Sequence, residues 1–417
     1  MLTKEFNYKV VPNGVCAAEG FLASGVHCGL RKNKNKPDLA LIYSENLCQA
    51  AAVYTQNKVK GAPIYVTQKH LGNNQAQAII VNSGNANTCN ANTCNANGEK
   101  DAKTMCQTIA AQLDIEEGDV VVASTGIIGQ PLPIDLISAA ASELKNQLSR
   151  EGNNQAAAAI LTTDTCQKEY ALSIEIAGKT VRIGGISKGS GMIHPNMATM
   201  LCFVTTDVAI EAALLQETLR AVTDETFNMV SVDGDTSTND MVTVLASGLA
   251  ENPLITDCQS AEYQIFIQGL YVVLRELSRK IAQDGEGASK LLECQVTGAK
   301  DKATARLIAK SVITSSLVKS AMFGQDPNWG RILCAIGYSE GDFSIENVQV
   351  DLASVKGRAT VCLNGSHIPF DVAQLEDILT EDEIFIYVDL GQGQAKATAW
   401  GCDLTYDYVK INADYHT

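Results

Sequence analysis

One glycine-rich segment leads into an apolar run and places a hydroxyl at the start of that run. Residues 184–195 contain four glycines and end on a proline, and Ala198-Thr199 follows directly before the apolar residues 200–204. This run predicts a buried strand that opens with the hydroxyl of Thr199. Such a threonine is either a nucleophile or an ordinary strand-end residue that bonds to the backbone. The segment matches neither Gly-x-x-x-x-Gly-Lys-[Ser/Thr] nor a complete Gly-x-Gly-x-x-Gly, so it does not indicate a phosphate-binding loop.

Short strand patterns and amphipathic helices must position this segment. Residues 118–124 form a β-type apolar run, and the segment after Pro133 repeats its apolar residues at helical spacing, which predicts a strand, a loop and a helix. Further core-facing helical stripes are Ala102, Cys106, Ile109 and Leu113; Leu215, Leu219 and Val222; and Phe266, Leu270, Val273, Leu277 and Ile281.

The last hundred residues are richer in strand patterns, at 348–352, 360–363, 384–388 and 395–400. Interleaved strands and helices predict an α/β (α+β) fold of layered sheets covered by helices. No repeat of 20 to 50 residues is visible, which argues against a solenoid or propeller.

A five-residue motif, Asn-Ala-Asn-Thr-Cys, occurs two and a half times in residues 85–97. It follows the apolar run 78–81 and consists of small polar residues. Such residues favour turns, so the sequence predicts a surface loop here.

The composition limits the class of partner. The 417 residues include 32 Lys and Arg against 47 Asp and Glu, which gives a net charge of −15, and 46% of the residues are hydrophobic. A core of useful size is expected, and the acidic balance argues against nucleic acid or an anionic membrane as the main partner. Small molecules or other proteins are the better candidates.

The cysteines and the chain start bear on the compartment. Thirteen cysteines are scattered singly, and five histidines form no zinc-type cluster with them. We therefore expect reduced thiols, no disulfides and no metal site. No apolar stretch approaches the roughly 18 residues of a membrane helix, and the start carries no secretory core, so a cytoplasmic protein is expected.

Beyond these patterns, the chain resembles the ornithine acetyltransferase (glutamate N-acetyltransferase) family of arginine biosynthesis. The resemblance includes residues 188–203 and seven further blocks in the expected order, spread over nearly the whole chain. These blocks are Val-Asn-Ser-Gly-Asn-Ala-Asn at 81–87, Ser-Thr-Gly-Ile-Ile-Gly at 124–129, Thr-Thr-Asp-Thr at 162–165, Ser-Val-Asp-Gly-Asp-Thr-Ser-Thr-Asn-Asp at 231–240, Asp-Gly-Glu-Gly-Ala at 284–288, Asp-Pro-Asn-Trp-Gly-Arg at 326–331 and Ile-Asn-Ala-Asp-Tyr-His-Thr at 411–417. The doubled Asn-Ala-Asn-Thr-Cys is the clearest departure, and it puts the conformation of that loop in doubt.

The resemblance implies self-cleavage at the Ala198-Thr199 bond and an N-terminal nucleophile. The residues suit this chemistry, because a threonine hydroxyl can attack the preceding carbonyl through a five-membered ring and the small Ala198 leaves room for it. Water then hydrolyses the ester. The new α-amine has an ordinary pKa of roughly 7.7 to 8.0, so it can act as the general base for its own hydroxyl. The implied fold is the self-cleaving αββα-like fold, with fragments 1–198 and 199–417 that fold together.

The resemblance also implies roles for individual residues. Thr125 and Gly126 would form the oxyanion hole, and substrate would be bound by Thr162, Lys188, Thr199, Glu286, Asn412 and Thr417. Lys188 suits a substrate carboxylate and Glu286 a substrate amine. Considered singly, these two charges are more often solvated loop residues, and Thr163 or Thr165 could replace Thr162.

The implied reaction is a ping-pong transfer of an acetyl group from N2-acetyl-L-ornithine to L-glutamate through an acetyl-threonyl enzyme. No metal or organic cofactor is implied, and acetyl-CoA remains open as a second acetyl donor. The implied assembly is a heterotetramer of two α and two β fragments. A frayed C-terminal tail is the alternative to a docked one, but Trp400, Leu404, Tyr408 and Ile411 offer apolar anchors.

Two other classes of protein remain as alternatives. An N-terminal-nucleophile aminopeptidase or amidohydrolase would share the threonine and differ only in using water to resolve the acyl-enzyme. A non-catalytic binding or scaffold protein would have no reason to keep Thr199, Lys188, Thr125, Gly126 and Glu286 together.

Overall fold

The computed structural model describes residues 6–89, 96–194 and 200–414, which divide into two units, each built around a sheet. The first unit consists of residues 1–189, 195–227 and 236–277, and the second of residues 190–194, 228–235 and 278–417. Both units therefore draw residues from either side of the predicted cleavage bond. Ala198 and Thr199 themselves lie outside the described residues, as does Thr417.

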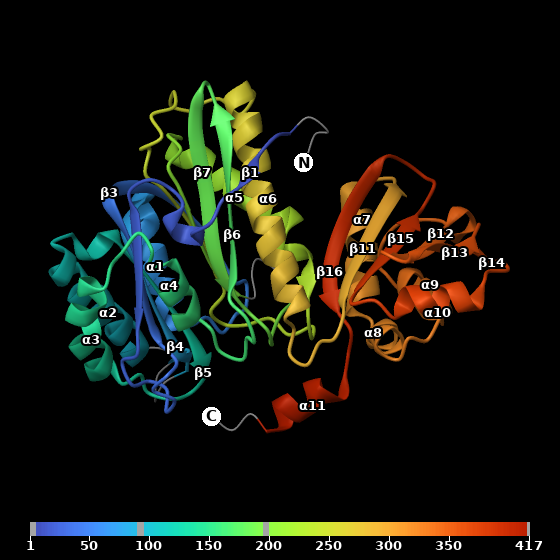
Figure 1. The fold of residues 1–417 in the computed structure, drawn as a ribbon, viewed down its shortest axis with the longest axis horizontal. Helices are drawn as coiled ribbons and strands as arrows, with labels where there is room; N and C mark the ends of the chain where they lie inside the picture. Colours follow the sequence, from blue (N-terminus) through green and yellow to red (C-terminus); the bar gives the residue numbers. More distant parts are fainter. Residues whose placement is uncertain (1–5, 90–95, 195–199, 415–417) are drawn as a thin grey trace. The chain divides into compact units, whose positions relative to one another are not determined.

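The first unit contains a mixed sheet of nine strands within the described residues (Figure 1). The strand order is β1 (Lys9–Val10), β6 (Lys168–Ile176), β7 (Lys179–Lys188), β8 (Leu201–Thr206), β10 (Met241–Ala246), β3 (Leu39–Tyr54), β4 (Gln75–Asn85) and β5 (Val120–Ile127), and β2 (Phe21–Val26) pairs with β3. The β8–β10 and β4–β5 pairs are parallel, whereas β7 and β8 are antiparallel, with Lys188 opposite Leu201.

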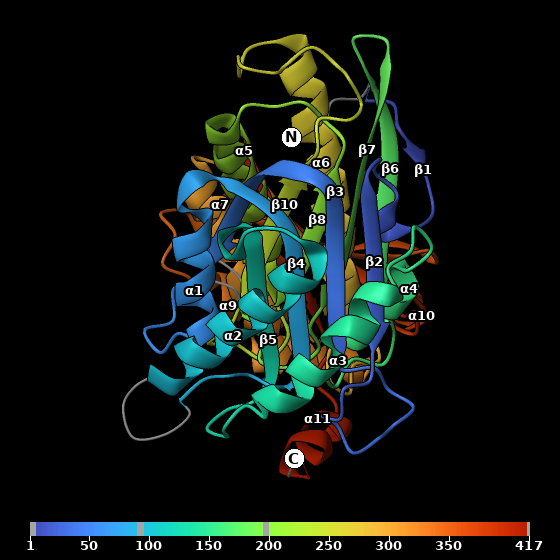
Figure 2. The same ribbon diagram turned by 90° about the vertical axis from the view of Figure 1, so that its left-hand side faces the viewer.

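Side chains of the central strands point alternately to the two faces of this sheet, and both faces are buried. Leu41 of β3 and Ile80 of β4 join a core with α1 (Ala62–His70), α2 (Ala96–Leu113) and α3 (Ile134–Asn146), and Figure 2 shows α2 and α3 over β4 and β5. Ile42 and Ile79, one residue away, join the opposite core with α4 (Asn153–Ala159). Successive residues of a strand point to opposite faces, so a sheet covered on both faces requires apolar residues at successive positions of its strands. The unit is completed by α5 (Ala212–Glu225) and the first part of α6 (Ala261–Gln283).

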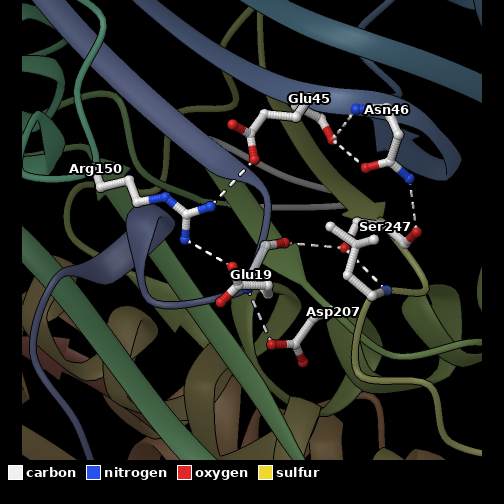
Figure 3. A network of polar contacts seen from close by, with 8 residues as sticks. Glu19, Glu45, Asn46, Arg150, Asp207 and Ser247 are labelled. Atoms are coloured by element: carbon white, nitrogen blue, oxygen red, sulfur yellow. Dashed lines mark hydrogen bonds and ion pairs between the residues drawn. The ribbon is translucent and has the colours of Figure 1, made fainter.

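A polar network ties the N-terminal segment to this sheet (Figure 3). Arg150 bridges Glu19 and Glu45 at 2.9 and 3.1 Å. The backbone amide of Glu19 donates to the buried carboxyl of Asp207 at 3.0 Å, and the Ser247 hydroxyl donates to the Glu19 carbonyl at 3.1 Å. The two ion pairs are exposed and contribute little, so the buried hydrogen bonds hold this segment.

The second unit contains a seven-stranded sheet in the part of the chain that the structure describes. Its order is β14 (Ser366–His367), β13 (Gly357–Leu363), β12 (Gln349–Ser354), β15 (Glu383–Asp389), β11 (Leu291–Ala299), β16 (Ala395–Cys402) and β9 (Val230–Ser231). The helices of this unit are α7 (Lys302–Thr314), α8 (Ser316–Phe323), α9 (Gly330–Gly337), α10 (Val372–Leu379) and α11 (Tyr406–Ala413).

The predicted α/β class is confirmed, with sheets covered by helices in the structure. The predicted strand at 118–124 appears as β5, the helix after Pro133 as α3, and the three helical stripes as α2, α5 and α6. The four C-terminal strand patterns appear as β12, β13, β15 and β16. None of the described helices has the length and apolar character needed to cross a membrane.

The predicted surface loop at 85–97 is wrong for residues 85–88, which are buried, whereas Cys89 is exposed. Asn85 ends β4, and Ala86, Asn87 and Thr88 are buried. The Asn87 side chain donates to the carbonyl of Gly98 at 2.9 Å, and its carbonyl accepts from Ala62. Small polar residues are tolerated in the interior here because their polar atoms are paired with backbone groups. Residues 90–95 lie outside the described residues.

Candidate active site

The predicted oxyanion pair lies at the end of β5. Thr125 and Gly126 are half-buried and follow five buried residues of that strand. Gly126 has a φ of 132°, and a Cβ there would lie 2.3 Å from the backbone carbon of Gly84. Only glycine fits such a close approach in this conformation. The strand end thus brings together a threonine hydroxyl and a glycine N–H, the two kinds of donor that can stabilise an oxyanion.

Thr162 and Lys188 are brought together by a buried carboxylate that the sequence prediction omitted. Asp164 accepts from the Thr162 amide at 2.9 Å and from the Gly189 amide at 2.7 Å. It also pairs with Lys168 at 2.7 Å, and both of these side chains are fully buried. Burial opposes ionisation of Asp164, but the ammonium groups of Lys188 and Lys168 outweigh it and hold its pKa below the usual range.

Lys188 is the last residue of β7 and is only 7% exposed, so it is not a solvated loop charge. Its ammonium interacts electrostatically with Asp164 and also with Asp240. Asp240 is buried, the Ser237 hydroxyl and the Met200 amide hydrogen-bond to its carboxyl, and burial raises its pKa well above the ordinary value. A buried cation at the end of a strand is suited to hold a substrate carboxylate.

Glu286 and Asn412, both in the second unit, are also in contact. The Asn412 amide donates to Glu286 Oε2 at 2.8 Å, from α11. The Glu286 backbone amide donates to the Ser190 carbonyl at 3.0 Å, and Gly191 leaves the space that the Glu286 carboxyl occupies. Glu286 is 9% exposed, so it too is more buried than an ordinary loop charge. The contact of Asn412 with Glu286 favours a docked α11 over a frayed tail.

Both flanks of the predicted cleavage bond are anchored by the segment 231–241. On the N-terminal side, Asp233 accepts from the amides of Met192 and Ile193 at 2.6 and 2.8 Å. On the C-terminal side, the Met241 amide donates to the Met200 carbonyl at 2.9 Å, where β8 begins beside β10.

The predicted site residues fall into sets by unit. Thr125, Gly126, Thr162 and Lys188 belong to the first unit, and Glu286 and Asn412 to the second. Asp164, Asn239 and Asp240 are the buried polar residues that the sequence prediction missed, although each stands in a block quoted for the resemblance. Residue type alone could not show that they are buried.

No group of three or more His, Cys, Asp or Glu side chains suited to a metal ion occurs in residues 6–89, 96–194 and 200–414. Ten cysteines in those ranges are free thiols, namely Cys16, Cys28, Cys48, Cys106, Cys202, Cys258, Cys294, Cys334, Cys362 and Cys402.

Comparisons with known proteins identify the family. The ArgJ family model matches residues 22–417. The arginine biosynthesis bifunctional protein ArgJ of Caldanaerobacter subterraneus subsp. tengcongensis is 49% identical over 96% of this chain and 97% of its own length, and that of Bacillus subtilis is 48% identical over 98% and 97%. A crystal structure of the arginine biosynthesis bifunctional protein argJ from Bacillus halodurans is 46% identical, with a TM-score of 0.50 over 52% of this chain and 100% of the solved one. The predicted membership is confirmed, and the chain belongs to the ArgJ family of N-acyltransferases of arginine biosynthesis.

Proposed function

We propose that the protein transfers the acetyl group of N2-acetyl-L-ornithine to L-glutamate through an acetyl-Thr199 intermediate. The observation that carries the proposal is the buried ammonium of Lys188 at the end of β7. It interacts with the Asp164 carboxylate, which also accepts a hydrogen bond from the Thr162 amide. Such an ammonium group binds a carboxylate, and both amino-acid substrates have one. β7 pairs with β8, which begins two residues after Thr199.

The first half-reaction forms the acyl-enzyme. Thr199 Oγ attacks the acetyl carbonyl carbon, its proton passes to the Thr199 α-amine, and the oxyanion is stabilised by the Thr125 hydroxyl and the Gly126 N–H. The amide C–N bond then breaks, and ornithine leaves with the proton returned by the α-ammonium. Glu286 is assigned to a substrate amine because a partly buried carboxylate favours a cation.

The second half-reaction regenerates the threonine. The glutamate amine attacks the acetyl ester, a proton again moves through the Thr199 α-amine, and N-acetylglutamate leaves as the C–Oγ bond breaks. Thr417 and Asn412 complete the proposed substrate contacts. Neither half-reaction calls on a metal or organic cofactor, so dialysis against EDTA should leave the transfer rate unchanged.

The proposal includes self-cleavage into fragments 1–198 and 199–417. The antiparallel pairing of β7 with β8 supports fragments that fold together, because the two strands lie on either side of the bond. The solved Bacillus halodurans chain is matched over its whole length and spans 52% of this chain, a length close to that of fragment 199–417. We further propose an assembly of two such fragment pairs in the cytoplasm. Free thiols such as Cys16, Cys202 and Cys294 favour that compartment.

The decisive experiment combines mass spectrometry with a coupled assay. A fragment whose N-terminal sequence is Thr-Met-Leu-Cys should appear in the denatured wild-type protein, and ornithine and N-acetylglutamate should form in equal amounts from acetylornithine and glutamate. Acetate without N-acetylglutamate would instead indicate the amidohydrolase. Thr199→Ala should neither cleave nor transfer, and normal turnover by that variant would overturn the nucleophile assignment.

A second acetyl donor, acetyl-CoA, is proposed because the matched relatives carry the word bifunctional in their names. The same enzyme, given acetyl-CoA and glutamate without acetylornithine, should release free CoA with N-acetylglutamate. Transfer from acetylornithine without any CoA release would restrict the protein to one donor.

A further inference from the structure

We propose that Asn239 is a positioning residue for the oxyanion turn, which we define as Thr125 and Gly126. Its carboxamide fixes the peptide that precedes Thr125 and, with it, the direction of the donors at the end of β5. The inference rests on the proposed function, which gives this turn its catalytic role.

The hydrogen bonds of Asn239 converge on the turn from a distant part of the chain. Its Nδ2 donates to the Ser124 carbonyl at 3.1 Å and to the Ala86 carbonyl at 2.6 Å. The Ser124 carbonyl belongs to the same planar peptide as the Thr125 N–H, so holding this oxygen fixes the plane in which Thr125 begins. Asn239 therefore acts on the peptide that directly precedes the residue of the proposed hydroxyl donor.

The sheet holds this peptide from one side only, because β5 is the last strand in the order of the described sheet. The register of the parallel β4–β5 pair shifts at Gly84 and Asn85, directly opposite Gly126. Beyond this point the chains pair irregularly, with the Ala86 amide donating to the Ile127 carbonyl. The Asn239 carboxamide bonds to Ser124, the residue before the oxyanion turn, and to Ala86, the residue after β4. It therefore links the two segments next to the point where the regular ladder ends.

The surroundings of Asn239 hold the carboxamide in one orientation. The Ala86 and Ser124 carbonyls can only accept, so the Nδ2 group must face them. The hydroxyls of Thr88 and Thr238 then each donate to Oδ1 at 2.6 Å. The side chain is 6% exposed, and a Cβ on Gly61 would lie 2.5 Å from Oδ1. Neither a rotated nor a longer side chain fits, and only a carboxamide supplies donors and an acceptor at this size.

A buried asparagine that bonds to backbone could instead serve stability alone. Asn252 offers the matched control, because it is 5% exposed, accepts from the Ala209 amide at 2.8 Å and donates to the Ala209 and Pro253 carbonyls at 3.1 and 2.8 Å. It lies in the first unit, and its bonds involve no residue assigned to the reaction. Alanine at either position removes a comparable set of hydrogen bonds.

The test compares Asn239→Ala with Asn252→Ala in the full chain, with rates normalised to the amount of fragment that begins with Thr199. For Asn239→Ala we expect kcat for acetyl transfer to fall about 10- to 100-fold with KM unchanged, since misdirected donors act on the transition state. For Asn252→Ala we expect wild-type kcat with a similar loss in melting temperature. Equal kcat in both variants, or a change confined to KM, would overturn the inference.

Two further measurements keep the outcome decisive. If Asn239→Ala does not fold, Thr88→Val removes one hydroxyl that orients the carboxamide, and wild-type kcat in that variant would count against the inference. The wild-type rate is the separate test of the proposed function. Absence of coupled transfer in the wild type would refute the function, whereas an active wild type with an equally active Asn239→Ala would refute only the positioning role.

Discussion

Replacing Asp164 by asparagine tests how strongly one buried carboxylate supports the site. Both carboxyl oxygens accept hydrogen bonds, Oδ1 from Lys168 and Gly189 and Oδ2 from the Thr162 amide. An asparagine amide must therefore turn its NH2 group toward an N–H donor in either orientation. The Lys168 ammonium, which is fully buried, also loses the negative charge of Asp164 beside it.

The expected cost follows from this burial. Removing one member of a buried ion pair typically costs about 3 to 5 kcal/mol, because the other charge stays desolvated. That is a large share of the roughly 5 to 15 kcal/mol by which a folded protein is stable. We expect Asp164→Asn to lower the free energy of unfolding by this amount at pH 7, measured by urea denaturation of the uncut Thr199→Ala background.

Asp207→Asn is the matched control. Asp207 is also buried and accepts two backbone amides, those of Arg182 at 2.7 Å and Glu19 at 3.0 Å, but its ionic partner Arg182 is 40% exposed. Burial raises the pKa of Asp207, opposite to the direction for Asp164. The control should therefore cost less than Asp164→Asn. Equal costs in the two variants, or a cost for Asp164→Asn below about 1 kcal/mol, would refute the argument from the buried pair.

The pH dependence gives this prediction a second measurement. Because the folded-state pKa of Asp164 lies below its unfolded value of about 3.9, its ionised form stabilises the protein above that pH. This contribution is lost as the pH falls below about 4 toward the folded-state pKa. The difference in stability between wild type and Asp164→Asn should therefore be full at pH 6 and shrink below pH 4, and a difference independent of pH would contradict the assignment.

Three further changes test other parts of the molecule. Gly191→Ala places a methyl group 2.3 Å from the Glu286 carboxyl. The KM of an amine-bearing substrate should therefore rise about tenfold, which corresponds to the loss of one hydrogen bond to a charged group. An unchanged KM would argue against Glu286 as the partner of the substrate amine. Burial raises the pKa of Asp240 well above its ordinary value, so the wild type should lose stability as the pH rises from about 4 to 7. In urea denaturation at pH 7, Asp240→Asn should be at least as stable as the wild type. A variant much less stable than the wild type at that pH would mean that the charged form is needed. Burial and the charge of Lys310 lower the pKa of His194 to about 4, so wild-type stability should fall as the pH drops from about 6.5 to 4. His194→Gln should lack the loss of stability that protonation of this histidine causes. Identical pH profiles of melting temperature for wild type and variant would contradict this prediction.

The secondary structure was the part that the sequence predicted best, for a local reason. The stripe at Ala102, Cys106 and Ile109 repeats every three or four residues, and all three side chains are buried on α2. Such periodicity depends only on neighbours in the chain, so it can be read without knowing the partner. The same holds for the strand runs that became β12 and β15.

The polar supports of the site could not be predicted in this way. Asn239 bonds to residues 115 and 153 positions away, and Asp164 to Gly189 at a distance of 25 positions. Asparagine and aspartate are typical of loops, and their sequence gives no sign of burial. Residues 86–88 were misjudged for the same reason, since distant partners satisfy their polar groups.

The strand order of the first sheet constrains how the two proposed fragments can be made. β8 and β10, both from residues after 199, lie between β7 and β3, both from residues before 198. A polypeptide ending at residue 198 would thus carry two separate parts of the sheet. Each part would have an unpaired, apolar edge strand, β7 in one and β3 in the other. Such edges are templates for aggregation. Producing the two fragments from separate genes should give inclusion bodies. When both are made as one continuous chain, β8 and β10 can pair with β7 and β3 before the proposed cleavage, so the uncut backbone keeps these edges covered during folding.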